Sequence, residues 1–148
     1  MELKELYQEI ILDHGKNPRN HGKCEKFNRE AKGHNPLCGD KVHIYLKLNA
    51  EKVVENVSFE GEGCAISLAS ASILTETIKG KNFNIAKKII DDFLNMIKNE
   101  VKITVNSLND DQKTTIMSLS GVKNFPMRVK CATMAWHTLT SALGKKND

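Results

Sequence analysis

Three of the four cysteines lie in local settings that favour the thiolate, the form of cysteine that binds metals and attacks sulfur. Cys38 lies in the segment NPLCGD, in which Pro36 stiffens the chain and Gly39 permits a tight turn. The turn allows the Cys38 thiolate and the Asp40 carboxylate to face one metal ion.

The other two cysteines are expected at the starts of helices. Cys64 follows a glycine-rich run where a predicted strand leads into a helix, so the positive end of the helix dipole favours its thiolate. Cys131 is predicted to open the last helix behind Arg128 and Lys130, whose charges lower the pKa of a thiol. Three thiolates and the Asp40 carboxylate suit tetrahedral Zn²⁺, or an iron–sulfur cluster with one hard oxygen ligand.

Each of these residues also has a structural alternative. A free cysteine often behaves as a small buried hydrophobic residue, and Asp40 alone could cap a turn. Cys24 stands among charged and polar residues and is predicted to be an exposed thiol without a role. His34 is close enough to Cys38 to be a candidate neighbour of a metal ligand, and His43 is expected to be solvated. No CxxC pair is present, which argues against a zinc finger or a thioredoxin-type motif.

The periodicity of hydrophobic residues predicts the elements that must position these side chains. The expected elements are a helix ending near Gly15, a loop over 16–40 with room for one short strand, strands over 42–48 and 53–59, helices over 65–79 and 82–99, a short strand over 101–105, a short helix over 110–119 and a last helix from about Val129. The order of helix, strands and then helices predicts an α+β fold, with a small antiparallel sheet of about three strands packed against helices.

Composition and charge exclude several classes of protein. A chain of 148 residues fits one domain, 1–148, and it has no apolar run long enough to span a membrane. The charged N-terminal segment lacks the features of a signal peptide, so a cytoplasmic location is expected. The net charge of +4 is scattered and aromatic residues are only 5%, which argues against nucleic-acid binding and favours an acidic protein partner.

The chain resembles the IscU/SufU/NifU N-terminal family of U-type iron–sulfur cluster assembly proteins. The motifs that carry the resemblance are LYQEIILDHGKNPRN (6–20), NPLCGD (35–40), FEGEGCAIS (59–67), SASILTETIKGK (70–81) and RVKCATMAW (128–136). The resemblance implies that the three cysteines converge at one exposed end of the α+β fold. It also implies that Cys38, Asp40, Cys64 and Cys131 are the metal ligands, or the cluster ligands if a [2Fe–2S] cluster is bound.

Two features are similar to the SufU branch of this family. Lys130 precedes the third cysteine where IscU-like chains carry a histidine, and the long segment after Cys64 resembles a SufU-type chain with an insertion within 98–125. This resemblance implies tightly held Zn²⁺ and a zinc-dependent sulfurtransferase role with a SufS-type cysteine desulfurase. Cys38 would accept the persulfide sulfur, and Arg128 would hold Asp40 or replace a ligand when the partner docks.

The alternative within the family is a scaffold that assembles a [2Fe–2S] cluster, or binds iron, on the same ligands. Both functions imply downstream cluster assembly proteins as partners, and the family resemblance implies a monomer or a weak dimer. A purely structural zinc site fits poorly, because structural sites rarely combine exposed loops with a carboxylate ligand.

Overall fold

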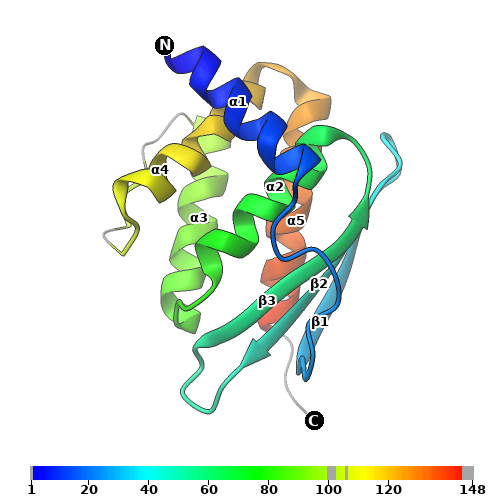
Figure 1. The fold of residues 1–148 in the computed structure, drawn as a ribbon, viewed down its shortest axis with the longest axis vertical. Helices are drawn as coiled ribbons and strands as arrows, with labels where there is room; N and C mark the ends of the chain where they lie inside the picture. Colours follow the sequence, from blue (N-terminus) through cyan, green and yellow to red (C-terminus); the bar gives the residue numbers. More distant parts are fainter. Residues whose placement is uncertain (1, 100–102, 106, 145–148) are drawn as a thin grey trace.

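A three-stranded antiparallel sheet forms one side of the molecule (Figure 1). The computed structural model describes residues 2–99, 103–105 and 107–144. The strands are β1 (Arg29–Asn35), β2 (Asp40–Leu48) and β3 (Val54–Glu62), in the order β1-β2-β3. Asn35 pairs with Asp40, and Lys41 pairs with Glu62. The turn between β1 and β2 and the end of β3 therefore meet at the same end of the sheet.

Helices cover one face of this sheet, as Figure 1 shows. They are α1 (Leu3–Lys16), α2 (Ala65–Ile78), α3 (Phe83–Asn99), α4 (Asp110–Met117) and α5 (Pro126–Gly144), with a 3₁₀ helix, η1 (Ser118–Asn124), between α4 and α5. α5 packs on β1 and β2, α2 packs on β3 and α5, and α1 packs on α2 and η1. The α+β fold expected from the sequence is confirmed.

The period-two pattern of β2 buries one face of the strand, as predicted. Val42, Ile44, Leu46 and Leu48 are each at most 7% exposed and belong to the hydrophobic core. α2 is instead buried almost all round, because its small residues let α5 approach closely. Ser70 accepts a hydrogen bond from Trp136 Nε1 at 2.9 Å and donates one to the carbonyl of Ala132 at 2.5 Å.

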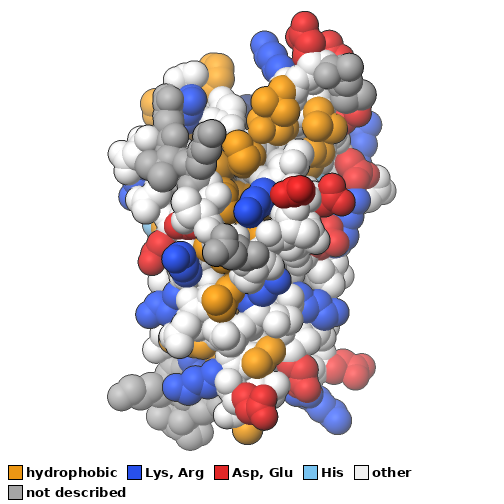
Figure 2. All heavy atoms as spheres, turned by 90° about the vertical axis from the view of Figure 1, so that its left-hand side faces the viewer, with side chains coloured by type: hydrophobic (Ala, Val, Ile, Leu, Met, Phe, Trp, Pro, Cys, Tyr) orange, Lys and Arg blue, Asp and Glu red, His pale blue; other side chains and the backbone are white. Residues whose placement is uncertain are grey.

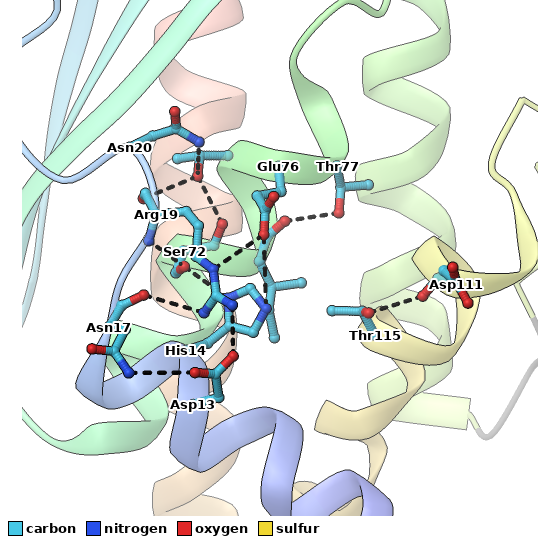
Figure 3. Close-up of polar contacts among 12 residues, drawn as sticks. Asp13, His14, Asn17, Arg19, Asn20, Ser72, Glu76, Thr77, Asp111 and Thr115 are labelled. Atoms are coloured by element: carbon cyan, nitrogen blue, oxygen red, sulfur yellow. Dashed lines mark hydrogen bonds and ion pairs between the residues drawn. The ribbon is translucent and has the colours of Figure 1, made fainter.

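A polar network fastens the end of α1 to α2 (Figure 3). Buried His14 has its Nδ1 2.8 Å from Ser72 Oγ, which also accepts the backbone N–H of Arg19 at 2.8 Å. The Arg19 guanidinium pairs with Asp13 at 2.6 Å and with Glu76 at 3.6 Å. The loop after α1 is therefore held on α2 by side chains from both segments.

Three predicted elements differ from the structure. The last helix begins at Pro126 rather than near Val129, because proline is well suited to the first position of a helix. The expected short helix divides into α4 and η1, and Asn109 starts α4 through a capping box with Gln112. Residues 103–105 form no strand, and the rest of that predicted strand, 101–102, lies outside the described residues. Among the described helices, none is long and apolar enough to cross a bilayer.

Candidate metal centre

The β1–β2 turn, the start of β2 and α5 bring three predicted site residues together. Cys38, Asp40 and Cys131 each offer one ligand atom, and these atoms all lie within 4.8 Å of one another. Cys38 is half-buried on the turn, whereas Asp40 and Cys131 are buried. The turn places Gly39 at φ +71, a left-handed conformation that glycine adopts without strain, as the sequence predicted.

Asp40 is completely buried, and only one of its two oxygens has a hydrogen-bond partner in the part of the chain that the structure describes. Its Oδ1 accepts a hydrogen bond from the backbone N–H of Cys64 at 3.0 Å. Among the described residues, Asp40 Oδ2 has no hydrogen-bond partner. An unpartnered buried oxygen is strongly unfavourable, so this atom is suited to receive a cation.

Cys64 is fixed beside this group by the hydrogen bond to Asp40. It is the N-cap residue of α2, which confirms its predicted place at a helix start, and it is half-buried. Gly63, immediately before it, adopts φ +148, and a Cβ added there would lie 2.1 Å from Asp40 Oδ1. Sequence reasoning treated the GEG run only as a connection, although a glycine next to a ligand cysteine can signal such a close approach.

The electrostatics of Cys131 differ from the sequence prediction. Burial raises the pKa of the Cys131 thiol, and hydrogen bonding with Asp40, Cys64 and Cys38 raises it further. The predicted net lowering of this pKa was wrong, because Cys131 lies in the second turn of α5, inside the cluster, where burial and hydrogen bonding outweigh the neighbouring Arg128 charge. A bound cation would reverse the effect, since a metal ion deprotonates the thiol that coordinates it.

Arg128 lies at the exposed side of the cluster, in the first turn of α5. The negative charge of Cys64, followed by hydrogen bonding to Cys131, raises the pKa of its guanidinium. Arg128 therefore supplies positive charge next to two of the candidate ligands. Lys130 is exposed.

Two predictions for residues outside the cluster were wrong. Cys24 is buried at 6% exposure, because the loop that carries it folds over the outer face of the sheet and Phe27 packs edge-on against Tyr45 at 5.0 Å. His43 is half-buried rather than solvated, and its Nε2 lies 3.0 Å from Glu30. His34 is exposed and is not one of the three residues whose ligand atoms meet.

This donor set fits a thiophilic cation. Sulfur ligands with one carboxylate oxygen are suited to Zn²⁺ or to iron–sulfur chemistry. The buried Asp40 Oδ2, which no described residue hydrogen-bonds, is an oxygen that a cation would satisfy, and Cys38 lies half-buried on the turn. The three residues whose ligand atoms meet do not include Cys64, which lies beside them through its backbone hydrogen bond to Asp40. Cys38 with Asp40, Cys64 and Cys131 come from three separate parts of the chain, so they are neighbours only in the folded protein.

The chain is similar to known proteins over nearly its whole length. The zinc-dependent sulfurtransferase SufU of Bacillus subtilis (strain 168) is 40% identical over 144 residues, which are 97% of this chain and 93% of the relative. The iron–sulfur cluster assembly scaffold protein IscU of Thermotoga maritima is 35% identical over 145 residues, 98% of this chain and 97% of the relative. The crystal structure of FiSufU from Fervidobacterium islandicum AW-1 superposes with a TM-score of 0.81 at 37% identity, covering 94% of this chain and 97% of that one.

The similarity to the SufU protein and to the IscU protein extends over nearly the whole chain. The sequence also matches the NifU-like N terminal domain over residues 6–145, which include all four candidate ligands. The chain therefore belongs to the NifU-like N-terminal domain family, together with the SufU and IscU proteins that it resembles.

Proposed function

We propose that this protein serves iron–sulfur cluster assembly as a zinc-dependent sulfur carrier that accepts persulfide sulfur from a cysteine desulfurase. The observation that carries the proposal is the buried Asp40 carboxylate, with one oxygen that has no hydrogen-bond partner among the described residues, set against the thiols of Cys38 and Cys131. The similarity to a zinc-dependent sulfurtransferase over 97% of the chain supports it.

Cys38, Asp40, Cys64 and Cys131 would hold the zinc ion. Bound Zn²⁺ would keep the coordinating sulfurs deprotonated at neutral pH. Asp40 would contribute Oδ2, while its Oδ1 keeps the hydrogen bond from the Cys64 N–H. One carboxylate would thus act both as a ligand and as the support of a second ligand.

Cys38 is the proposed sulfur acceptor because it is half-buried on the β1–β2 turn, whereas Cys131 is buried. Cys64 is also half-buried, but it is the N-cap of α2 and its backbone is held by Asp40. The Cys38 thiolate attacks the outer sulfur of a persulfide on the desulfurase. A new S–S bond forms at Cys38, the S–S bond on the desulfurase breaks, and the donor cysteine leaves as a thiolate. The sulfur atom is transferred without an external oxidant or reductant.

Arg128 is proposed to assist this exchange. Its guanidinium lies beside Cys64 and Cys131 and is exposed toward an arriving partner. It would balance the negative charge of these thiolates while Cys38 carries the sulfur.

A scaffold function is the second candidate, with the iron–sulfur cluster as cargo on the same four residues. The observation that favours it is the 35% identity to an IscU scaffold protein over 98% of the chain. The presence of Lys130 where IscU-like chains carry a histidine favours the sulfur carrier.

Elemental analysis of anaerobically purified protein, followed by desulfurase turnover with and without it, separates the two functions. The carrier predicts one equivalent of zinc and a strong increase in turnover, which Cys38→Ser abolishes. Cys24→Ala is the matched control, because Cys24 is a buried thiol outside the cluster, and it should retain the stimulation. Iron with acid-labile sulfide and little stimulation would instead support the scaffold.

A further inference from the structure

An apolar groove runs between α1 and η1, close to the candidate metal centre. It has a volume of about 730 Å³, and its walls include Leu3 and Tyr7 of α1 and Phe125 at the end of η1. Leu3 is 60% exposed and Phe125 is 61% exposed. Figure 2 shows hydrophobic side chains gathered in the upper part of one face, toward the end of the molecule where Figure 1 places the N-terminus.

The charged side chains that line the groove are positive. Lys4 and Arg128 line it, and no carboxylate does so among the described lining residues. A segment that covered Lys4 and Arg128 would remove water from these cations and would have to supply anionic partners for them. The groove is therefore complementary to a segment that carries both apolar side chains and carboxylates.

The groove is continuous with the cysteine cluster. Ile66, in the first turn of α2 just after Cys64, forms part of its wall. Arg128 lines the groove and also lies beside the thiols of Cys64 and Cys131. A segment seated in the groove would therefore hold the rest of its protein against the half-buried Cys38 end of the cluster.

We propose that this groove is the docking site for an acidic, apolar segment of the persulfide-bearing desulfurase. The inference rests on the proposed sulfur-carrier function and adds the surface that positions the donor. An amphipathic helix with its apolar face in a groove is a recurrent recognition mode, and the volume admits several large side chains. η1 belongs to the segment 98–125, so that segment would supply one wall of the docking site.

A second copy of this chain is a poorer occupant. Each copy has a net charge of +4, and a symmetric contact through this groove would bring two sets of Lys4 and Arg128 toward one another. Like charges at an interface oppose association.

The test measures the affinity of zinc-loaded protein for the cysteine desulfurase, together with zinc content and turnover at saturating protein. Phe125→Ser should raise the Kd about 10-fold, the usual size for loss of an aromatic contact in an interface. Lys4→Glu should raise it about 3-fold or more, and more strongly at low salt. Zinc content and saturating turnover should stay at the wild-type level, because neither residue belongs to the cluster.

Each variant has a matched control. Leu12→Ser changes a leucine of α1 that is 54% exposed and does not line the groove, and Lys88→Glu reverses an exposed charge on α3. Both should keep the Kd within about 2-fold of wild type. Lys4→Glu places a negative charge near the start of α1, which favours the helix, so loss of folding is not expected.

Two results would overturn the inference and leave the sulfur carrier intact. In one, the wild type binds and stimulates the desulfurase, and the groove variants behave as their controls do. In the other, the wild type is a dimer that Phe125→Ser converts to a monomer with unchanged affinity for the desulfurase. Failure of the wild type to bind or stimulate the desulfurase would overturn the proposed function and the docking site together.

Discussion

Asp40 and Gly63 are fitted to each other at the sheet end, because the carboxylate occupies the space that any side chain at position 63 would need. A Cβ there would lie 2.1 Å from Asp40 Oδ1 and 2.9 Å from its Cγ. The same oxygen accepts the N–H of Cys64 at 3.0 Å. The backbone before the second cysteine is thus shaped around the carboxylate.

Gly63→Ala should therefore disturb both stability and metal binding. The residue has φ +148, which is strained for alanine, and the methyl group would displace Asp40. We expect a loss of about 2 kcal/mol in the free energy of unfolding and weaker zinc binding. Thermal unfolding and zinc titration measure the two effects. Gly121→Ala is the control, because among the described residues no atom lies within 4 Å of its added Cβ; an equal effect there would contradict the explanation.

Substitutions at Asp40 separate its two roles. Asp40→Asn keeps an acceptor for the Cys64 N–H but removes the anionic oxygen, whereas Asp40→Ala removes both. Both variants should bind zinc at least about 10-fold more weakly, since losing the support of a ligand alone already costs that much, with alanine the weaker, as competition with a chelator can measure. Controlled sulfur transfer should fall with zinc affinity. A scaffold would instead retain its cluster in Asp40→Ala and release it more slowly.

His14 should make the stability of the protein depend on pH. Burial lowers the pKa of His14 below its ordinary 6.5, the charge of Arg19 lowers it further, and Glu76 and Asp13 partly oppose the shift. The unfolded chain therefore binds the proton more readily, and stability should fall as the pH drops through and below 6.5. Chemical denaturation at pH 7.5 and 5.5 tests this in wild type and His14→Gln.

The His14→Gln variant should lose part of this pH dependence. Burial also lowers the pKa of His137, so part of the slope will persist until His137→Gln is added. A wild-type slope unchanged by His14→Gln would show that the network in Figure 3 does not discriminate between the two charge states of His14.

Ser70 should contribute to stability through the core tryptophan. Trp136 is fully buried, stacks on Phe93 with ring centroids 4.0 Å apart, and donates its Nε1 hydrogen to Ser70 Oγ at 2.9 Å. Ser70→Ala leaves that donor unpaired, which costs about 1–3 kcal/mol. Urea unfolding measures the change. Ser141→Ala, at an exposed serine of α5, should alter stability by less than about 0.5 kcal/mol, and a similar loss in both would exclude the hydrogen bond as the cause.

The sequence predicts most of the fold because its hydrophobic periods are regular. The alternation in β2 and the three-to-four-residue spacing in α1 and α3 need no tertiary information. The start of α5 was harder to predict from the sequence, since only the fixed φ of Pro126 signals it.

The candidate site was predictable where residue type and local turn chemistry suffice. Cys38 and Asp40 share one turn, and Cys64 starts a helix, so short segments reveal their chemistry. The burial of Cys24 and the raised pKa of Cys131 depend on how distant segments pack. The residues next to each cysteine in the sequence predicted the opposite: an exposed Cys24 and a lowered pKa for Cys131. The match between Gly63 and Asp40 is likewise a tertiary relationship.

The pairing of Lys41 with Glu62 gives the sheet a further role. Sliding β3 by one residue along β2 would turn its side chains to the opposite face and carry Cys64 away from Asp40. The native alignment keeps the Cys64 N–H on Asp40 Oδ1, beside the ligand atoms of Cys38, Asp40 and Cys131. Metal binding that includes Cys64 would favour that alignment among the alternatives open to the folding chain. The metal would then stabilise the native register of β2 and β3, and its removal should increase hydrogen exchange first at this end of the sheet.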